Sequence, residues 1–117
     1  MNVPDEDQRV PAEVAEFVHE HIDRLETLHV LLLLHATAPR GWSIRDVSFE
    51  RQSSAYSAEL SLRQLSRAGL LVRDESLFRF QPHTAELAER AAWLVWWYQA
   101  RPNSVITLIF SGHRRPT

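Results

Sequence analysis

Apolar residues recur three and four positions apart over most of the chain, and this spacing predicts a series of amphipathic helices. Several of the expected helices also begin at a recognisable signal, either a proline or the capping sequences Ser43-x-x-Asp46 and Asp23-x-x-Glu26. The expected helices run from Pro11 to about His21, from Leu25 to about Thr37, from Ser43 to about Arg51, from Ser54 to Ala68, and from Thr84 to a break at Arg101-Pro102-Asn103. We therefore expect a mainly helical protein.

The helix expected over residues 54–68 carries a narrow apolar stripe. Ala58, Leu62 and Leu65 recur at i, i+4 and i+7, so they share one face. Gly69 follows directly and can adopt the positive φ that ends a helix. This helix is therefore expected to pack on a core through that stripe, with its other side free.

A short hairpin is expected directly after Gly69. The residues of 70–73 and 77–80 favour strands, and Asp74-Glu75-Ser76 between them favour a turn. A helix, a turn, a second helix and a small hairpin in this order predict a winged helix-turn-helix. The alternative is a small α+β domain of another kind that also places a helix before a hairpin.

The chain resembles small bacterial MarR-like winged-helix proteins from about Phe17 to Phe110. The resemblance is carried by residues 22–34, Trp42-Ser43, Gly69-Leu70-Leu71, residues 78–82, residues 98–102 and Val105-Ile106. It implies a dimeric, cytoplasmic transcriptional regulator with extra helices on both sides of the motif, and it implies no established ligand. On this basis we expect a single winged-helix domain over residues 11–113. Its parts would be a helix-turn-helix at about 43–68, a wing at about 70–81 and C-terminal helices at about 84–110, with 1–10 as a flexible acidic tail.

Two helical segments have unusual apolar patterns. The helix expected over 25–37 is apolar on nearly all sides, which is typical of the central helix of a bundle. The last segment, residues 105–110, is rich in β-branched residues and by propensity would be a strand, whereas the resemblance favours a helix capped by Ser104.

Composition excludes several classes of protein. The 117 residues suit one domain, and the chain has no cysteine, so disulfides, thiolate metal sites and cysteine nucleophiles are excluded. Its apolar runs, among them Val30 to Leu34, are far shorter than a membrane span of about 20 residues. The acidic start of the sequence does not resemble a secretory signal, and we expect a cytoplasmic protein without membrane contact.

The net charge of −2 conceals an asymmetry, since residues 1–26 carry −6 and the remainder carries +4. Every basic residue is arginine, whose planar fork suits phosphates and guanine edges. A coding bias toward arginine explains the same composition equally well. With a pI near 6.3 the chain lacks the strongly basic character typical of DNA-binding proteins, so charge permits DNA binding without arguing for it.

DNA contact is expected from the start of the second motif helix, from the ends of the first and from the hairpin. The candidate DNA-binding residues are Arg45, Arg51, Ser54, Tyr56, Ser57, Ser61, Arg63, Gln64, Arg73 and Arg79. Glu59 and Leu60 on the same helix and the acidic hairpin tip argue against strong binding, although a glutamate can accept from cytosine. The alternative is an ordinary solvated helix face.

Three tryptophans on the helix after the hairpin cannot all face one core, so a partner is expected to cover part of this surface. The candidate dimer-interface residues are Phe17, Trp93, Trp96, Trp97, Ile106 and Phe110. Two alternatives remain, namely simple core packing and a small-molecule cage.

The histidines do not have the spacing of a metal site, and no phosphate-binding loop or nucleophile motif is present. We therefore expect no cofactor, no metal and no enzymatic activity. The expected function is sequence-selective, dimeric DNA binding by a transcriptional regulator. The alternative is a winged-helix module for protein–protein interaction without DNA binding.

Overall fold

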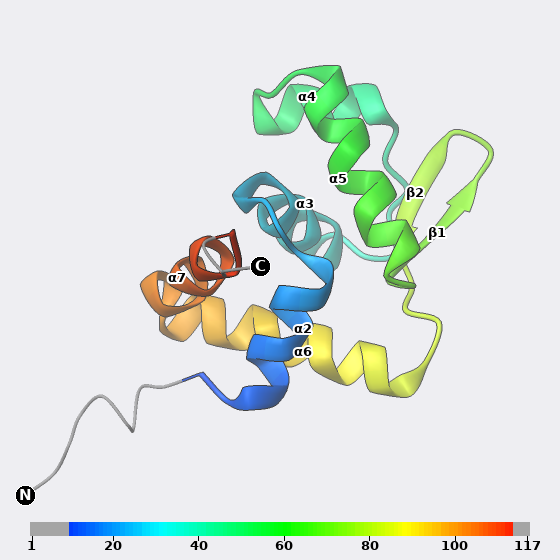
Figure 1. Ribbon diagram of the computed structural model, residues 1–117. Coiled ribbons are helices and arrows are strands. Elements are labelled where there is room, and N and C mark those ends of the chain that lie inside the picture. The colour runs from blue at the N-terminus through cyan, green and yellow to red at the C-terminus, as the bar shows by residue number, and fades with distance from the viewer. Residues whose placement is uncertain (1–9, 114–117) are drawn as a thin grey trace, which may run out of the picture.

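A computed structural model describes the backbone of residues 10–113 and the side chains of residues 10–111 (Figure 1). Within these residues the chain forms helices and one small sheet. The elements are α2 (Ala12–His21), α3 (Leu25–Ala36), α4 (Ile44–Arg51), α5 (Ala55–Arg67), β1 (Leu71–Asp74), β2 (Leu77–Phe80), α6 (Ala85–Ala100) and α7 (Pro102–His113). The prediction of a mainly helical chain with a small hairpin is confirmed. The predicted tail of residues 1–10 lies outside the described part except for Val10, which packs against the core.

Side-chain caps begin three of the helices. The hydroxyls of Ser43, Ser54 and Thr84 accept hydrogen bonds from the backbone N–H groups three residues on, at 3.0, 3.0 and 3.1 Å. Each bond satisfies one of the donors that a helix leaves unpaired at its first turn. The predicted starts of α4, α5 and α6 are confirmed.

The predicted cap of α3 is wrong. This helix begins after Arg24 and has no side-chain cap. The Oδ1 atom of Asp23 instead accepts a hydrogen bond of 2.9 Å from Nε2 of Gln64 on α5. A contact with a distant helix has replaced the local contact that the spacing predicted.

The two strands form an antiparallel hairpin in which Leu71 pairs with Phe80 and Asp74 with Leu77. Gly69, with φ of +83°, makes the left-handed turn that takes the chain from α5 into β1. The segment before α4 also joins this sheet, because Trp42 and Phe78 exchange two backbone hydrogen bonds of 2.7 Å. The hairpin is thereby tied to the start of α4.

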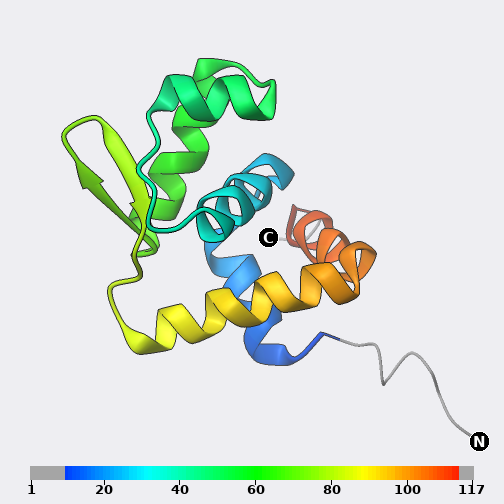
Figure 2. The same cartoon turned by 180° about the vertical axis from the view of Figure 1, so that it is seen from behind.

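One core connects all the helices, and α3 lies at its centre. Figures 1 and 2 show α3 between the pair α4–α5 and the helix α6. The fully buried side chains of α3 include Leu28, Leu31 and Leu34, which confirms the prediction of a central helix. The predicted stripe of α5 is also confirmed, since Ala58, Leu62 and Leu65 are all 0% exposed.

The last segment is a helix, so its strand propensity gave the wrong structure. It begins at Pro102 rather than after Ser104, because proline is well suited to the first turn of a helix. Val105 and Ile109, four residues apart, are buried in the core. Within the described residues, no helix is long and apolar enough to cross a membrane.

Candidate nucleic-acid interface

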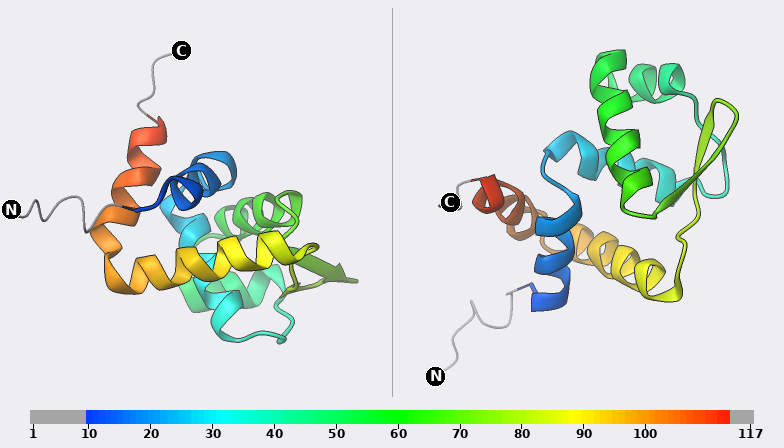
Figure 3. Two further views of the ribbon diagram at one scale, coloured as in Figure 1. Left: turned by 90° about the horizontal axis from the view of Figure 1, so that it is seen from below. Right: turned by 45° about the vertical axis from the view of Figure 1, so that its right-hand side comes forward.

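The helix α5 presents one flank to solvent. It packs across α4, and the hairpin stands beside it (Figure 3, right). Tyr56, Leu60, Arg63 and Arg67 recur at i, i+4, i+7 and i+11 and form one exposed row, which we call the α5 row. Tyr56 is 72% exposed and Leu60 is 38% exposed. This row is the surface that α5 can offer to a partner.

The hydroxyl-bearing flank of α5 lies inside the molecule, which corrects the prediction for Ser61. Ser61 is 0% exposed, and its Oγ accepts hydrogen bonds of 3.2 Å from both Arg24 and Thr27. Ser57 is half-buried and accepts from Arg24 at 2.5 Å. Gln64 is half-buried as well and donates to Asp23. The segment that leads into α3 therefore covers this flank.

The physical reason is the position of these residues on the helical wheel. Ser57, Ser61 and Gln64 each directly precede a residue of the buried stripe, so they lie about 100° from it rather than opposite it. These three side chains therefore lie at the edge of the core and not on the solvent-facing side of α5. The exposed Ser54 differs, because its hydroxyl caps the helix.

Arg63 in the α5 row forms an ion pair with Glu59 one turn earlier, with Nη2 and Oε2 2.9 Å apart. The side chains are 59% and 39% exposed, so solvent screens the pair and its contribution to stability is small. A phosphate could therefore displace Glu59 at little cost. Arg67 also points to solvent and makes no side-chain hydrogen bond or ion pair within residues 10–111.

Arg51 is not free to bind a phosphate. Its Nε and Nη2 donate to the two carboxylate oxygens of Glu26, both at 3.2 Å, and Nη2 also lies 2.9 Å from Nδ1 of His29. Burial, and then the charge of Arg51, lower the pKa of His29, while Glu26 opposes the shift. Arg51 therefore ties α4 to α3 and is a poor candidate for DNA contact.

The first motif helix contributes a freer arginine near its start. Arg45 of α4 is exposed, and within residues 10–111 its side chain makes no hydrogen bond or ion pair. It lies beyond the Ser43 cap at the N-terminus of α4, where positive backbone charge already favours an anion.

The hairpin carries two further predicted arginines. Arg73 is exposed; its Nε donates to the backbone oxygen of Glu75 at 2.8 Å, and its guanidinium lies over the ring of Phe78. Arg79 is half-buried and forms an ion pair with Asp74 across the hairpin. All of these contacts are made within the hairpin and at its surface. They position the two arginine side chains but leave them at the surface.

The surface as a whole is close to neutral. Between residues 43 and 81, six arginines stand against five carboxylates, and Arg51 is already taken by Glu26. Non-specific attraction to a phosphate backbone is therefore weak at this face.

Sequence reasoning missed one prominent residue of this region. Phe49 on α4 is 84% exposed, more than any other large apolar side chain of the described residues. The helical period contained the signal, because Val47 faces the core and Phe49, two positions later, must face away from it.

A second exposed aromatic surface lies on α6 and α7, at the far side of the molecule from α4. Trp93, Trp96 and Phe110 are 42%, 59% and 49% exposed, and Trp97 is half-buried with its ring against that of Trp96. Among the other predicted interface residues, Ile106 is half-buried.

Phe17 is not available to a partner, which corrects its prediction as an interface residue. It is 5% exposed and lies with Val14 and Val18 on the face of α2 that contributes to the core. The apolar stripe of α2 thus serves the fold itself.

Comparisons with models of protein families, with curated proteins and with solved structures found no match to this chain. The resemblance to MarR-like proteins therefore stays a prediction, and function has to be argued from the surfaces described above.

Proposed function

We propose that this protein is a winged helix-turn-helix transcriptional regulator that binds double-stranded DNA with sequence selectivity. The observation that carries the proposal is the α5 row, an exposed helix flank with two arginines that lies beside an arginine-bearing hairpin. In such proteins the second motif helix enters the major groove while the first crosses the backbone.

The arrangement of α4, α5 and the hairpin supports this assignment. A turn of three residues, 52–54, joins the two helices, and Ser54 caps the helix that would enter the groove. The hairpin would act as the wing. Because Trp42 bridges to Phe78, this wing has a fixed position relative to α4.

The side chains of the α5 row have distinct tasks under this proposal. Arg63 and Arg67 would bind phosphates or guanine edges, and the Tyr56 hydroxyl would donate to a phosphate or a base. Leu60 fits against a thymine methyl group. Arg45, Arg73 and Arg79 would contact the backbone on both sides of the groove.

The near-neutral surface determines the kind of binding that we propose. With few net positive charges on this face, random DNA is bound weakly. Affinity must then come from base contacts together with a few arginine–phosphate contacts, so we propose a selective site whose affinity still falls as salt rises.

The proposal includes a homodimer, which would present two α5 helices to one two-fold DNA site. The exposed Phe110 on α7 supports it, because an exposed aromatic side chain of this kind is commonly covered by a partner. Sedimentation over a range of protein concentrations tests the homodimer. A Phe110→Ser variant with the same dimer dissociation constant as the parent would contradict it.

The test of DNA binding is a selection from random duplexes followed by fluorescence polarisation at several salt concentrations. Arg63→Ala should weaken binding of a selected duplex and reduce the salt slope by about one. The matched control is Arg90→Ala, which removes an i,i+4 pair with Glu86 on α6, away from the proposed interface. No enrichment at low salt, or equal losses in both variants, contradicts the proposal.

A second candidate function is protein–protein interaction without DNA binding, and the exposure of Phe49 favours it. Phe49 and Tyr56 lie on either side of the turn between α4 and α5, and they are 84% and 72% exposed. DNA offers little apolar surface for such a pair, whereas a protein interface commonly uses aromatic anchors. Loss of a protein partner in Phe49→Ser, with no duplex enriched for the parent, would favour this second function.

A further inference from the structure

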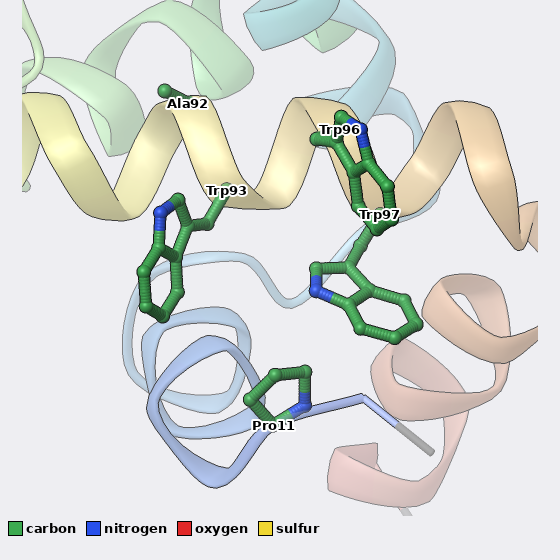
Figure 4. Close-up of a pocket in the computed structure, with 5 residues that line it drawn as sticks. All are labelled: Pro11, Ala92, Trp93, Trp96 and Trp97. Atoms are coloured by element: carbon green, nitrogen blue, oxygen red, sulfur yellow. The ribbon is translucent and has the colours of Figure 1, made fainter. Parts of the chain in front are cut away.

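A slot on the α6 surface is built from indole rings. Figure 4 shows Trp93 and Trp97 projecting from α6 on either side of a gap, with Pro11 across the gap from the helix. Together with Ala92 and Trp96 these residues line a hollow of about 460 Å³. This volume lies within the usual range of small-molecule sites, about 300–1,000 Å³.

The slot is lined by three indole rings, and indole rings attract cations at their faces. A tryptophan face carries negative electrostatic potential, so a cation within about 6 Å of the ring centre is stabilised. Trp96 and Trp97 meet edge to face with ring centroids 5.2 Å apart, so their faces point in different directions around the hollow.

A line of carboxylates continues from the slot along the same two helices. Between α2 and α6, a second hollow of about 320 Å³ is lined by four carboxylates and one arginine, with three further residues: Glu13, Glu16, Glu20, Glu86, Arg90, Phe17, His21 and Leu87. Glu86 forms an ion pair with Arg90, and Oε1 of Glu20 lies 3.6 Å from Nε2 of His21. Glu13 and Glu16 have no ion-pair partner within residues 10–111, and Glu13 lies two residues after Pro11. Negative charge therefore lies next to the aromatic slot.

We propose that the slot between α6 and the start of α2 binds a small aromatic cation with a quaternary ammonium group. The aromatic part lies between Trp93 and Trp97, and the ammonium group lies toward Glu13 and Glu16. Both halves of the groove favour this charge, because indole faces and carboxylates attract cations and repel anions. A purely apolar occupant would use the tryptophans and leave the carboxylates without a role.

The proposal does not depend on DNA binding, and its test contains no DNA. Phenyltrimethylammonium is titrated into the full-length protein by calorimetry or by following tryptophan side-chain NMR signals. The controls are tert-butylbenzene, which has the same shape without the charge, and benzenesulfonate, which carries the opposite charge. We expect saturable binding of the cation, about tenfold tighter than that of the neutral compound, and no binding of the anion.

Two variants test the two halves of the groove. Trp93→Leu, and separately Glu13→Gln with Glu16→Gln, should each weaken binding of the cation about fivefold or more. All three residues are exposed, so neither variant empties the core. The matched control is Glu50→Gln, which removes an exposed carboxylate from α4 and should leave binding unchanged.

Three results would overturn the proposal. One is equal affinity for the cation and its neutral counterpart, which would make the slot merely apolar. Another is cation binding that none of the variants changes. The last is no saturable binding of the cation. If Trp93→Leu then also separates a dimer, a second copy of the chain occupies the slot.

Discussion

The guanidinium of Arg51 lies 2.9 Å from Nδ1 of His29. An arginine side chain only donates hydrogen bonds, so this histidine nitrogen must accept, and the ring is neutral with its proton on Nε2. The other ring nitrogen lies 3.4 Å from the hydroxyl of Tyr98 on α6. One imidazole on α3 thus joins the end of α4 to the helix that carries the tryptophans.

Acid should weaken the fold through His29. Its pKa is lowered in the folded protein by burial and by Arg51, so the unfolded chain takes up the proton first as pH falls below the ordinary value of 6.5. The contribution of His29 to the free energy of unfolding should therefore be fully present above this pH. It should fall as the pH approaches the lower pKa of the folded state. We expect the urea midpoint to decline between about pH 7 and 5 in the parent and to decline less in His29→Gln. Parallel declines would contradict the role of His29.

Ser61 and Tyr56 should respond in opposite ways to truncation. Ser61→Ala leaves Arg24 and Thr27 without their shared acceptor, so we expect a loss of about 1–2 kcal/mol in unfolding free energy. Its affinity for any duplex selected by the parent should not change. Tyr56→Ala should leave stability within about 0.5 kcal/mol and weaken binding. If Ser61→Ala instead weakened DNA binding and Tyr56→Ala instead lowered stability, the α5 row would not be the binding surface.

Two leucines of α5 provide a matched pair for core and surface. Leu62 is 0% exposed and Leu60 is 38% exposed. Leu62→Ala should lower the free energy of unfolding by about 2–5 kcal/mol, because it leaves a cavity. Leu60→Ala should cost less than about 1 kcal/mol. Urea unfolding measures both, and similar losses would mean that α5 is packed differently.

Gly69 should not tolerate a side chain. Its φ is +83°, and an added Cβ would lie 3.0 Å from Cδ1 of Leu87. Gly69→Ala should therefore reduce stability by about 1 kcal/mol or more, since the left-handed backbone and the contact both oppose it. At Gly41 an added Cβ would meet Cβ of Leu77 at 3.1 Å, but the backbone there is not left-handed, so Gly41→Ala should cost less. Thermal melts of both variants make the comparison.

The sequence was informative wherever a local rule decides the outcome. The buried stripe of Ala58, Leu62 and Leu65 follows from the helical period, and the caps at Ser43 and Thr84 follow from side-chain chemistry at helix starts. The central position of α3 follows from apolar residues on all of its sides.

The candidate site was less predictable, because distant contacts decide which side chains remain free. Ser61 is covered by Arg24, which is 37 positions earlier in the chain. Arg51 is neutralised by Glu26, 25 positions earlier. No periodicity within α4 or α5 contains this information. By contrast, the exposure of Phe49 was available from the period of its own helix and was overlooked.

The pairing of Trp42 with Phe78 has a consequence for recognition. Two backbone hydrogen bonds join the hairpin to the chain that enters α4, and the Arg40 guanidinium lies over the Trp42 ring, 3.7 Å from its centroid. The hairpin therefore cannot swing toward a target by itself. Under the proposed function the protein is a rigid template of preset width, and it is the double helix that must bend or widen to match it.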